Sequence, residues 1–528
     1  MLEKLTPQVR IIIATVLSFG FFALYDHYFI PKTPLVETNT TTSSQALPAS
    51  TASAPQIATS LSTDVADAPL VATKEGDIIA TIKAPSYELH IDKLGRITKF
   101  YLLEGKYKND QGERFQLVDA TQGLLPLEIR FSDKALNADA FVIPYSADKH
   151  SVDVSEGGST LVLSQTLGSM VVTKTLTFYP AGNYDVHVKL SEPKEYFITA
   201  GFRPSVALDS YTFHGALIKK SDGTIKTIDD GSVKVDERFD KARIVANADK
   251  YYTTFMYELS LGLDTVVTIG KENNPLVFIK GSDDFKASGY IGPKDFQLLK
   301  SIHPELTDVV EYGFFTFIAK PLFTLLSYLH GIFGNWGWAI VFMTIIVRLV
   351  LYPLTYKGMV SMNKLKELGP KVKELQAKYG DDKQKLNTHM MELYKKHGAN
   401  PMGGCLPILL QIPVFFAVYR VLQNAIELKG AAWILWVQDL AVMDPYFILP
   451  VAMGITMFLH QRITPTTFTD PMQEKIMKFL PLIFTFFFVT FPAGLTLYWF
   501  TNNLASIVQQ FYVNRLFAKK NEEQKAEK

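Results

Sequence analysis

The sequence predicts a multi-domain chain in which a polytopic α-helical membrane bundle is joined to an all-β domain. Hydrophobic residues make up 48% of the 528 residues, and they are unevenly distributed. Residues 31–300 have the composition of a soluble protein, whereas residues 334–515 contain one long apolar run after another. A spanning helix needs about 20 mostly apolar residues. The later part of the chain can therefore cross a membrane several times.

Six segments are predicted to span the membrane, and five of them form the core of the bundle. The first lies within residues 1–30 and is preceded by Lys4 and Arg10, as in a signal sequence. No small-x-small cleavage site follows it, so we interpret it as an uncleaved signal anchor with a cytoplasmic N-terminus. The six segments are Ile11–Ile30, Trp336–Tyr356, Cys405–Asn424, Tyr446–Gln461, Ile476–Phe491 and Leu495–Val513.

A further apolar segment, 312–331, is interpreted as an amphipathic helix that lies in the outer interface, within the region 304–333. Lys320 and Pro321 lie at its centre, where they would be costly in a span. The loop 357–400 contains ten Lys and five acidic residues. The positive-inside rule places such a loop in the cytoplasm, and one more span would put it outside. A kinked seventh span remains the alternative.

The segment between the first two spans is predicted to form a tethered β-domain. Residues 31–75 are rich in Ser, Thr, Ala and Pro, a composition typical of a flexible linker. Residues 76–303 then contain many short alternating runs, such as "STLVLSQTLGSMVVTKTLTFYPAGNYDVHVKLS", which predicts strand, turn, strand, turn, strand. This pattern favours a β-sandwich. Four histidines are scattered along residues 76–300 without metal-ligand spacing: His90, His150, His187 and His214. We therefore expect a non-catalytic domain, with sugar binding as an open alternative.

The region 357–403 is predicted to form a cytoplasmic helical hairpin between the second and third spans. Its first arm has apolar residues at spacings of 3, 4, 3 and 4, a heptad seam, at Leu365, Leu368, Val372, Leu375 and Tyr379. "YGDDK" then supplies a helix stop and a new start. The hairpin is either a solvated coiled coil that connects two spans or a docking arm for a ribosome, a nascent chain or acidic lipid. The candidate contact residues are Lys371, Lys378, Lys383 and Lys385.

Polar residues inside the later spans fall on defined helix faces. Thr344, Arg348 and Thr355 share one face of the second span. The last span carries Trp499, Asn503, Ser506 and Gln510 on one face, and the third span carries Gln411. Polar residues in spans usually face the bundle interior or a wet cavity, so the three sets could line one hydrophilic space. Hydrogen bonding between helices is the simpler alternative.

Arg348 is the costliest of these residues. It lies nine residues before Lys357, or about 13 Å along a helix, so the side chain cannot reach the cytoplasm unaided. An arginine near mid-bilayer costs about 2.5–3.5 kcal/mol on insertion scales. The five later spans contain no Asp or Glu to neutralise it. We expect water, dipoles and a visiting anion to stabilise its charge.

Several function classes are disfavoured. The single cysteine, Cys405, allows no disulfide framework and no multi-cysteine metal site, and no Walker-type glycine loop is present. An intramembrane hydrolase would need a partner for His460, and a solute transporter would typically show a repeat. We therefore expect no enzyme activity, no catalytic residues, no metal and no cofactor.

Four stretches closely resemble the YidC family of membrane protein insertases. They are "GNWGWAIVFMTIIVRLVLYPLT", "GDDKQKLNTHMMELYKKHGANPMGGCLPILLQIPVFFAVY", "DPYFILPVAMGITMFLHQRITPTT" and "DPMQEKIMKFLPLIFTFFFVTFPAGLTLYWFTNNL". The match covers roughly residues 305–515 in order. Residues 76–303 resemble, more weakly, the periplasmic β-supersandwich of Gram-negative members.

The resemblance implies a five-span core, divided here between 334–356 and 404–515, around a hydrophilic groove. That groove opens to the cytoplasm and to lipid and is sealed on the outer side. Arg348 matches the family's groove arginine, and Thr344, Gln411 and Trp499 fall at groove positions. The complete set of expected groove residues is Arg348, Thr344, Gln411, Trp499, Tyr498, Asn503, Ser506 and Gln510.

The resemblance also implies partners and a location. The chain is expected to insert and help fold nascent membrane proteins in the inner membrane, alone or with the Sec translocon, as a monomer in the phospholipid bilayer. Both termini would be cytoplasmic and the β-domain periplasmic. A ribosome is the one expected partner that contains nucleic acid. The tail 516–528 is short and mixes Lys with Glu, so we expect its contact with the ribosome to be weak.

Overall fold

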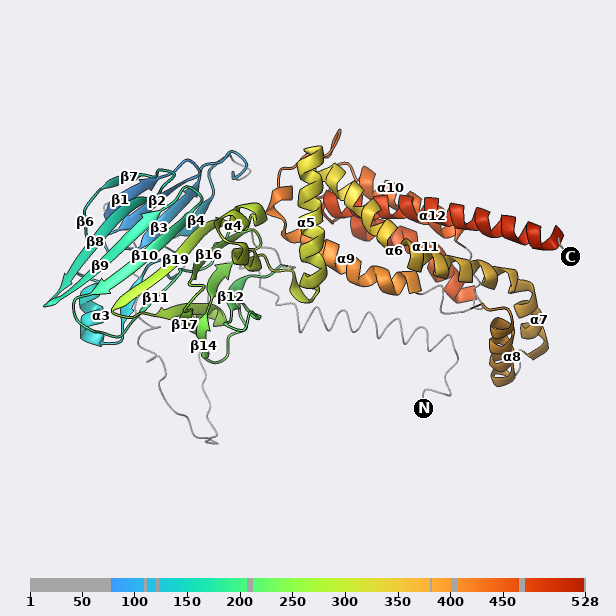
Figure 1. The fold of residues 1–528 in the computed structure, drawn as a ribbon, viewed down its shortest axis with the longest axis horizontal. Helices are drawn as coiled ribbons and strands as arrows, with labels where there is room; N and C mark the ends of the chain where they lie inside the picture. Colours follow the sequence, from blue (N-terminus) through green and yellow to red (C-terminus); the bar gives the residue numbers. More distant parts are fainter. Residues whose placement is uncertain are drawn as a thin grey trace, which may run out of the picture. The chain divides into compact units, whose positions relative to one another are not determined.

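The computed structural model describes residues 77–108, 112–119, 121, 123–206, 212–379, 382–399, 406–464 and 471–526. Contacts divide the chain into two compact units, Met1–Val310 and Glu311–Lys528. The described part of the first unit is rich in strands and the second is helical (Figure 1). This division confirms the predicted combination of a β-domain with a helical region. The predicted signal anchor, the linker 31–75 and Cys405 lie outside the described residues.

The strands of the first unit form three sheets (Figure 1). The first has the order β4-β3-β2-β1-β7, with β1 Ile78–Lys83, β2 Tyr87–Asp92, β3 Ile97–Leu102, β4 Gln116–Asp119 and β7 Ser151–Asp153. The second has the order β13-β12-β15-β16-β19-β10-β9-β8-β6, with β6 Ser146–Ala147, β8 Ser159–Leu167, β9 Met170–Phe178, β10 Asn183–Leu190, β12 Gly215–Lys219, β13 Ile225–Asp229, β15 Ile244–Ala248, β16 Tyr252–Tyr257 and β19 Asp284–Pro293. The third has the order β14-β17-β18-β11-β5, with β5 Ile129–Phe131, β11 Tyr196–Ile198, β14 Glu237–Ala242, β17 Leu263–Ile269 and β18 Pro275–Lys280.

The meander β8-β9-β10 follows the strand and turn pattern expected from the sequence. The segment around "KLGRI" differs from expectation, because it holds three strands, β1 to β3, where the sequence showed two β-rich runs. The domain also contains two short helices, α3 Lys134–Ala140 and α4 Phe296–Ile302. Each begins at an aspartate, Asp133 or Asp295, whose carboxylate accepts hydrogen bonds from the first turn.

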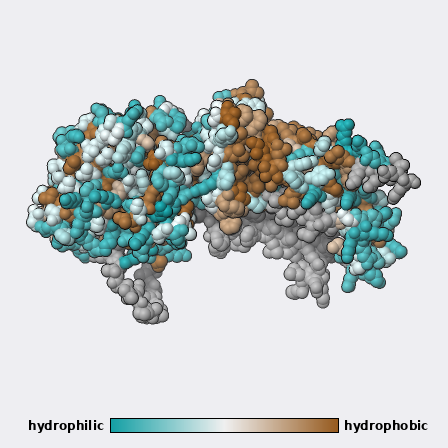
Figure 2. Space-filling view, in the orientation of Figure 1, coloured by the Kyte–Doolittle hydropathy of each residue, from teal (hydrophilic) through white to brown (hydrophobic). Residues whose placement is uncertain are grey.

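The second unit is a helical bundle with a hairpin at one end (Figure 1). Its helices are α5 Thr316–Phe333, α6 Trp336–Glu367, α7 Gly369–Tyr379, α8 Lys383–Lys396, α9 Leu406–Asn424, α10 Ile448–Ile463, α11 Pro471–Phe488 and α12 Ala493–Ala526. Figure 2 shows hydrophobic surface gathered over the bundle and hydrophilic surface around the α7–α8 end. α6 and α12 are longer than the predicted spans, since α6 continues past Pro353 and Gly358 to Glu367 and α12 continues past Val513 to Ala526.

By length and composition, two of the described helical segments can cross a membrane, Gly313–Phe333 and α6, and α10 is a shorter apolar helix. The segment Gly313–Phe333 includes α5, which the sequence analysis places in the interface. α5 buries one stripe and exposes large apolar side chains on the rest of its surface, including Phe317 and Tyr328. In Figure 1, α5 runs across the direction of α12. The number of spans stays a prediction.

The hairpin buries its heptad seam against itself. Leu365, Leu368, Val372 and Tyr394 form a buried cluster, against which Met390 packs. The first arm is divided, since α6 continues to Glu367 and α7 starts at Gly369. The apolar residues of the hairpin are thus used for its own packing, and the lysines remain outside.

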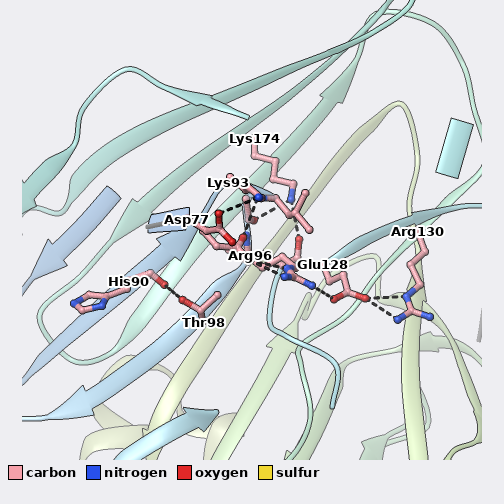
Figure 3. Close-up of polar contacts among 12 residues, drawn as sticks. Asp77, His90, Lys93, Arg96, Thr98, Glu128, Arg130 and Lys174 are labelled. Atoms are coloured by element: carbon pink, nitrogen blue, oxygen red, sulfur yellow. Dashed lines mark hydrogen bonds and ion pairs between the residues drawn. The ribbon is translucent and has the colours of Figure 1, made fainter. Parts of the chain in front are cut away.

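The core of the β-domain contains a charged cluster that connects the first and third sheets (Figure 3). Arg96, in the turn after β2, forms ion pairs with Asp92 of β2 at 2.7 Å and with Glu128 at 3.0 Å. Glu128 also pairs with Arg130 of β5 at 2.8 Å. All four side chains are buried, so the cluster persists only because each charge has a partner.

Lys174 of β9 lies beside this cluster at a core position of the alternating strand. Its Nζ donates hydrogen bonds to the carbonyl oxygens of Gly95 at 3.0 Å and Leu127 at 2.8 Å, and it lies 4.5 Å from the centre of the Tyr145 ring. Burial lowers the pKa of the Lys174 ammonium from 10.5 to about 7, and the charge of Asp92 partly opposes this shift.

This pKa predicts a pH-dependent stability. Between about pH 7 and 10.5 the unfolded chain holds a proton on Lys174 that the folded domain has released, so stability rises with pH in this window. We expect the free energy of unfolding of the isolated β-domain to rise by about 1 kcal/mol per pH unit between about pH 7.5 and 9. Urea unfolding at each pH measures this slope.

Lys174→Met should remove the slope, because it removes the ammonium whose pKa burial lowers to about 7. Lys189→Met is the matched control, since Lys189 is exposed on the neighbouring strand β10, and it should keep the slope. A flat profile for the unmodified domain would contradict the account.

Candidate functional site

Arg348 of α6 is bound by two residues of α12. Its Nε donates a hydrogen bond to Oδ1 of Asn502 at 2.6 Å, and its Nη2 donates to Oγ of Ser506 at 2.6 Å and to the carbonyl oxygen of Asn502 at 3.4 Å. Asn502 and Ser506 are four residues apart, so both lie on the face of α12 that meets α6. Both are buried, and Arg348 is partly exposed.

The partners of Arg348 orient its charge without neutralising it. An amide oxygen, a hydroxyl and a carbonyl carry no formal charge, and no carboxylate pairs with Arg348 among the described residues. A guanidinium has five N–H groups. Within the described part of the chain, the two on Nη1 form no hydrogen bond. Arg348 can therefore still bind an anion through a free pair of donors.

Two threonines on the face of Arg348 bond to their own helix. The Thr344 hydroxyl donates to the carbonyl oxygen of Ile340 at 2.7 Å, and the Thr355 hydroxyl bonds to Leu351 and Tyr352. Both threonines are buried. Neither holds Arg348 directly, and that they line a groove stays a prediction.

A chain of amides continues from Ser506 along α12 towards the hairpin end of the bundle. Gln510 Nε2 donates to Oδ1 of Asn514 at 2.8 Å, and Asn363 Nδ2 of α6 donates to the same oxygen at 3.0 Å. Asn514 Nδ2 donates in turn to the carbonyl oxygen of Ile463 at 3.0 Å. Asn514 therefore joins α6, α10 and α12.

The sequence analysis did not single out Asn363 and Asn514. Asn514 follows Gln510 by four residues and continues the polar face of the last span, but it lies beyond the predicted end at Val513. Asn363 lies in the part of α6 that was assigned to the hairpin. A search beyond the apolar limits of the two spans would have found both.

The other predicted groove residues contact different neighbours. Gln411 of α9 donates to the hydroxyl of Tyr498 at 3.0 Å. Asn503 donates to the carbonyl oxygen of Met453 in α10 at 3.3 Å. Trp499 packs among aromatic rings of α9 and α11, which are Phe415, Phe484 and Phe488.

The predicted polar face of α12 is thus divided among several helices. Asn502 rather than Asn503 holds Arg348, and Trp499 faces an aromatic cluster.

Three of the four candidate lysines of the hairpin are exposed. Lys371 lies 3.3 Å from the His397 ring, Lys385 pairs with Asp382 at 3.1 Å, and Lys378 lies over the Tyr379 ring. The side chain of Lys383 lies outside the described part of the chain. That these lysines bind a partner stays a prediction.

The four histidines that the sequence analysis considered in the β-domain each contact a nearby polar group. His187 pairs with Asp284, and His90 lies 3.0 Å from Glu88. His150 bonds to a carbonyl oxygen, and His214 lies 3.3 Å from the Thr212 hydroxyl. Among the described residues, no three His, Cys, Asp or Glu side chains come together in a way that could hold a metal ion.

Comparison with known families matches two parts of the chain. The family described as 60Kd inner membrane protein matches residues 328–521, which include α6 to α11 and most of α12, and therefore Arg348 and its partners. The family described as YidC periplasmic domain matches residues 235–325.

Similar proteins extend over the full length. The chain is 54% identical to a Campylobacter jejuni protein named "Membrane protein insertase YidC", and the match covers 98% of each chain. It is also 54% identical to a Wolinella succinogenes protein of the same name, over 98% of this chain and 97% of that one. A solved structure titled "Active YidC insertase crystal structure with the first transmembrane domain resolved" has 19% identity and a TM-score of 0.38, covering 83% of this chain and 94% of that one.

The amide junction at Asn514 predicts a measurable stability effect. Asn514→Leu leaves the donors of Asn363 and Gln510 without their acceptor, which costs about 1–3 kcal/mol for each buried group left unpaired. We expect a lower melting temperature for the full chain in detergent. Tyr512→Leu is the control, since Tyr512 is 55% exposed on the same helix. Equal melting temperatures for Asn514→Leu and the unmodified chain would contradict this role.

Proposed function

The chain belongs to the YidC family of membrane protein insertases, and we propose that Arg348 and its α12 partners receive the polar flank of a nascent membrane protein during insertion. The observation that carries this proposal is the pairing of Arg348 with Asn502 and Ser506 and with no carboxylate among the described residues. The charge is oriented and still able to attract an anion. An acidic flank of a client protein supplies such an anion.

The polar residues support a path from the cytoplasm to Arg348. Ser506, Gln510 and Asn514 follow one another along α12 from Arg348 towards the hairpin end of the bundle. Water and polar groups can exchange hydrogen bonds with such side chains at low cost. We infer that this path is the hydrophilic groove, open to the cytoplasm and to lipid.

Insertion then has two steps, which are the binding of the client's polar flank in the groove and the burial of its apolar segment in lipid. A client enters from the cytoplasm as a hairpin, and its polar outer flank enters the groove, where the Nη1 donors of Arg348 bind its acidic groups. The apolar segment passes sideways into lipid along the third and fifth spans. The burial of about 20 apolar residues supplies the driving force, at a fraction of a kcal/mol each for the most apolar. The process needs no bond-breaking step and no cofactor.

The proposed topology has six spans, with both termini in the cytoplasm and the β-domain in the periplasm of a cell with an inner membrane. We assign α5 to the outer interface rather than to a span. Its buried stripe is supported by Leu322, Leu326 and Leu329, while Phe317 and Tyr328 remain exposed on the other side. A helix that is apolar on both sides and interrupted by Lys320 and Pro321 suits the boundary between lipid and water.

The remaining parts of the chain have proposed partners. The three sheets of the β-domain support a supersandwich. The exposed lysines of the α7–α8 hairpin suit a ribosome, the Sec translocon or acidic lipid, and we propose that the chain acts alone or with the translocon. α12 continues as a helix to Ala526. Its last part, within 516–528, mixes Lys with Glu, so it should add little to ribosome binding.

Depletion of the protein tests the function itself. When the chain is depleted, small membrane proteins with one or two spans should accumulate uninserted on the cytoplasmic side. Pulse-labelling of these proteins measures this accumulation. A cytosolic protein labelled in the same cells is the control. Normal insertion of every such client in depleted cells would contradict the proposal.

Neutralising Arg348 in place tests its role. Asn502→Asp puts a carboxylate where an amide oxygen now lies 2.6 Å from Nε, so Arg348 becomes an ion pair with little change in shape. We expect insertion of a client with an acidic outer flank to fall about tenfold, the effect of about 1.4 kcal/mol. A client with a neutral flank should insert normally.

Arg348→Ala should lower insertion of the same acidic client, and Arg348→Lys should retain part of it, because a lysine keeps the charge without the paired donors. Expression and melting temperature control for folding. Equal insertion of both clients in all variants would remove the anion-binding role.

The topology is tested by cysteine labelling from the outer side in a Cys405→Ser chain. A membrane-impermeant maleimide should label Gln438→Cys, in the segment between α9 and α10, and spare Met391→Cys in α8. Both positions are exposed in the structure. If α5 were a span, the hairpin would lie outside, and Met391→Cys would react instead.

A further inference from the structure

The segment between α9 and α10 contains a loop, 431–440, that is closed on itself. The backbone N–H of Leu440 donates to the carbonyl oxygen of Ala431 at 3.0 Å, and that of Trp433 donates to Val437 at 2.9 Å. Val437 and Leu440 are buried. The loop is therefore a small packed body rather than an extended connection.

One side of this loop is fastened to the start of α6. Trp433 lies directly on the backbone of Gly337, where a Cβ atom would collide with the indole ring. Asn335 Nδ2 donates to the carbonyl oxygens of Ala432 at 3.0 Å and Trp433 at 3.1 Å, while its Oδ1 caps α6 by accepting from Trp338 at 3.0 Å. We call Asn335, Gly337 and Trp433 the outer clamp.

The other side of the loop is fastened to the start of α12. The N–H of Gly494 donates to the carbonyl oxygen of Leu440 at 2.9 Å, and the N–H of Ala493 donates to Val442 at 2.7 Å. A Cβ at Gly494 would lie 3.1 Å from the oxygen of Leu440 and 3.4 Å from Cδ1 of Ile340 in α6. The loop, α6 and α12 thus meet at one point.

Buried apolar side chains meet at this point. Ile340, Met343, Leu440 and Leu497 have no exposed surface. Thr344, the nearest polar residue of α6, gives its hydroxyl to Ile340 within the same helix. Towards the hairpin, by contrast, the residues that α6 and α12 bury include amides and hydroxyls, those of Thr355, Asn363, Ser506 and Gln510. The two helices that hold Arg348 therefore carry a polar layer on one side of it and an apolar layer on the other.

From this arrangement we propose that the outer clamp is a set of positioning residues that hold the outer ends of α6 and α12 together during insertion. Trp433 seated on Gly337 keeps the apolar layer closed, so that Arg348 is reached from the cytoplasm and not from the periplasm. A client flank is then drawn to Arg348 without a continuous water path across the membrane. The inference rests on the proposed function and topology, and goes beyond them by assigning the seal to named residues.

The proposal is tested by measuring how fast a cysteine near Arg348 reacts with a thiol reagent added from either side of the membrane. The cysteine is introduced as Leu351→Cys in a Cys405→Ser chain and serves as the reporter. Leu351 lies three residues after Arg348 on the same face of α6 and is partly exposed. The probe is 2-sulfonatoethyl methanethiosulfonate, a small anionic thiol reagent, added to either side of sealed membranes. With an intact clamp, the reporter should react from the cytoplasmic side alone.

Two substitutions, one that removes side-chain volume and one that adds it, should each open the contact between Trp433 and Gly337. Trp433→Ala removes the indole, and Gly337→Ala adds a methyl group that displaces it. Each should raise the rate of reaction from the outer side by about tenfold, the change expected when an aromatic contact is lost from a closed state. The cytoplasmic rate should not change. Leu435→Ala is the matched control, because Leu435 lies in the same loop and is 74% exposed.

Asn335→Asp disturbs the packing less than Trp433→Ala does, and it replaces that variant if Trp433→Ala does not accumulate in cells. Aspartate keeps the cap on Trp338 and all the apolar packing, but it has no N–H for Ala432 and Trp433. It should also raise the outer rate. Unchanged outer rates in Gly337→Ala and Asn335→Asp, in chains that still insert clients, would overturn the proposal, and so would outer reactivity with the clamp intact.

Failure of the clamp can be told apart from failure of the proposed function. If the reporter reacts from the cytoplasm alone in every variant, the groove remains and the clamp role is wrong. If it reacts from neither side with the clamp intact, the groove itself is absent, and the clamp role falls with it.

Discussion

The binding of the Arg348 guanidinium by uncharged groups is the interaction on which the rest of this account depends. A cation inside an apolar span is costly, and an aspartate or glutamate partner would relieve the cost by cancelling the charge. Here Asn502 and Ser506 supply oriented oxygen atoms instead. The charge is held in place, and two of its donors remain free among the described residues. An arginine that was fully paired would be a structural element only.

This constraint explains why the bundle is divided along α6 and α12. On the hairpin side of Arg348, α6 and α12 bury several polar residues, which include Asn363, Ser506 and Gln510, and Asn363 is bonded to Asn514. On the other side, Ile340, Met343 and Leu497 are buried, and the loop 431–440 is hydrogen-bonded to the start of α12. A polar path that continued through the membrane would leak ions, and an apolar layer on both sides would leave Arg348 without water. The proposed groove and outer clamp would avoid both outcomes.

The sequence singles out Arg348 as an unusual residue, because its charge and its distance from the helix end follow from local chemistry and helix geometry. It also predicted the strand meander and the heptad seam, because both follow from the spacing of apolar residues along the chain. It did not predict that Asn502, rather than Asn503, would hold Arg348, since neighbouring residues differ by about 100° around a helix and the rotation of α12 is set by its packing. Lys174 and the Trp433–Gly337 contact were also missed. Each depends on residues far apart in the chain, which periodicity cannot bring together.

The most direct test of the central claim is site-specific photo-crosslinking between Leu351, three residues after Arg348 in α6, and the outer flank of a ribosome-bound client. The client carries either aspartate or asparagine in that flank and is otherwise identical. The account predicts a higher crosslinking yield for the aspartate flank in the unmodified chain, and equal yields for the two flanks in Arg348→Gln. Equal yields for the two flanks in the unmodified chain would contradict it.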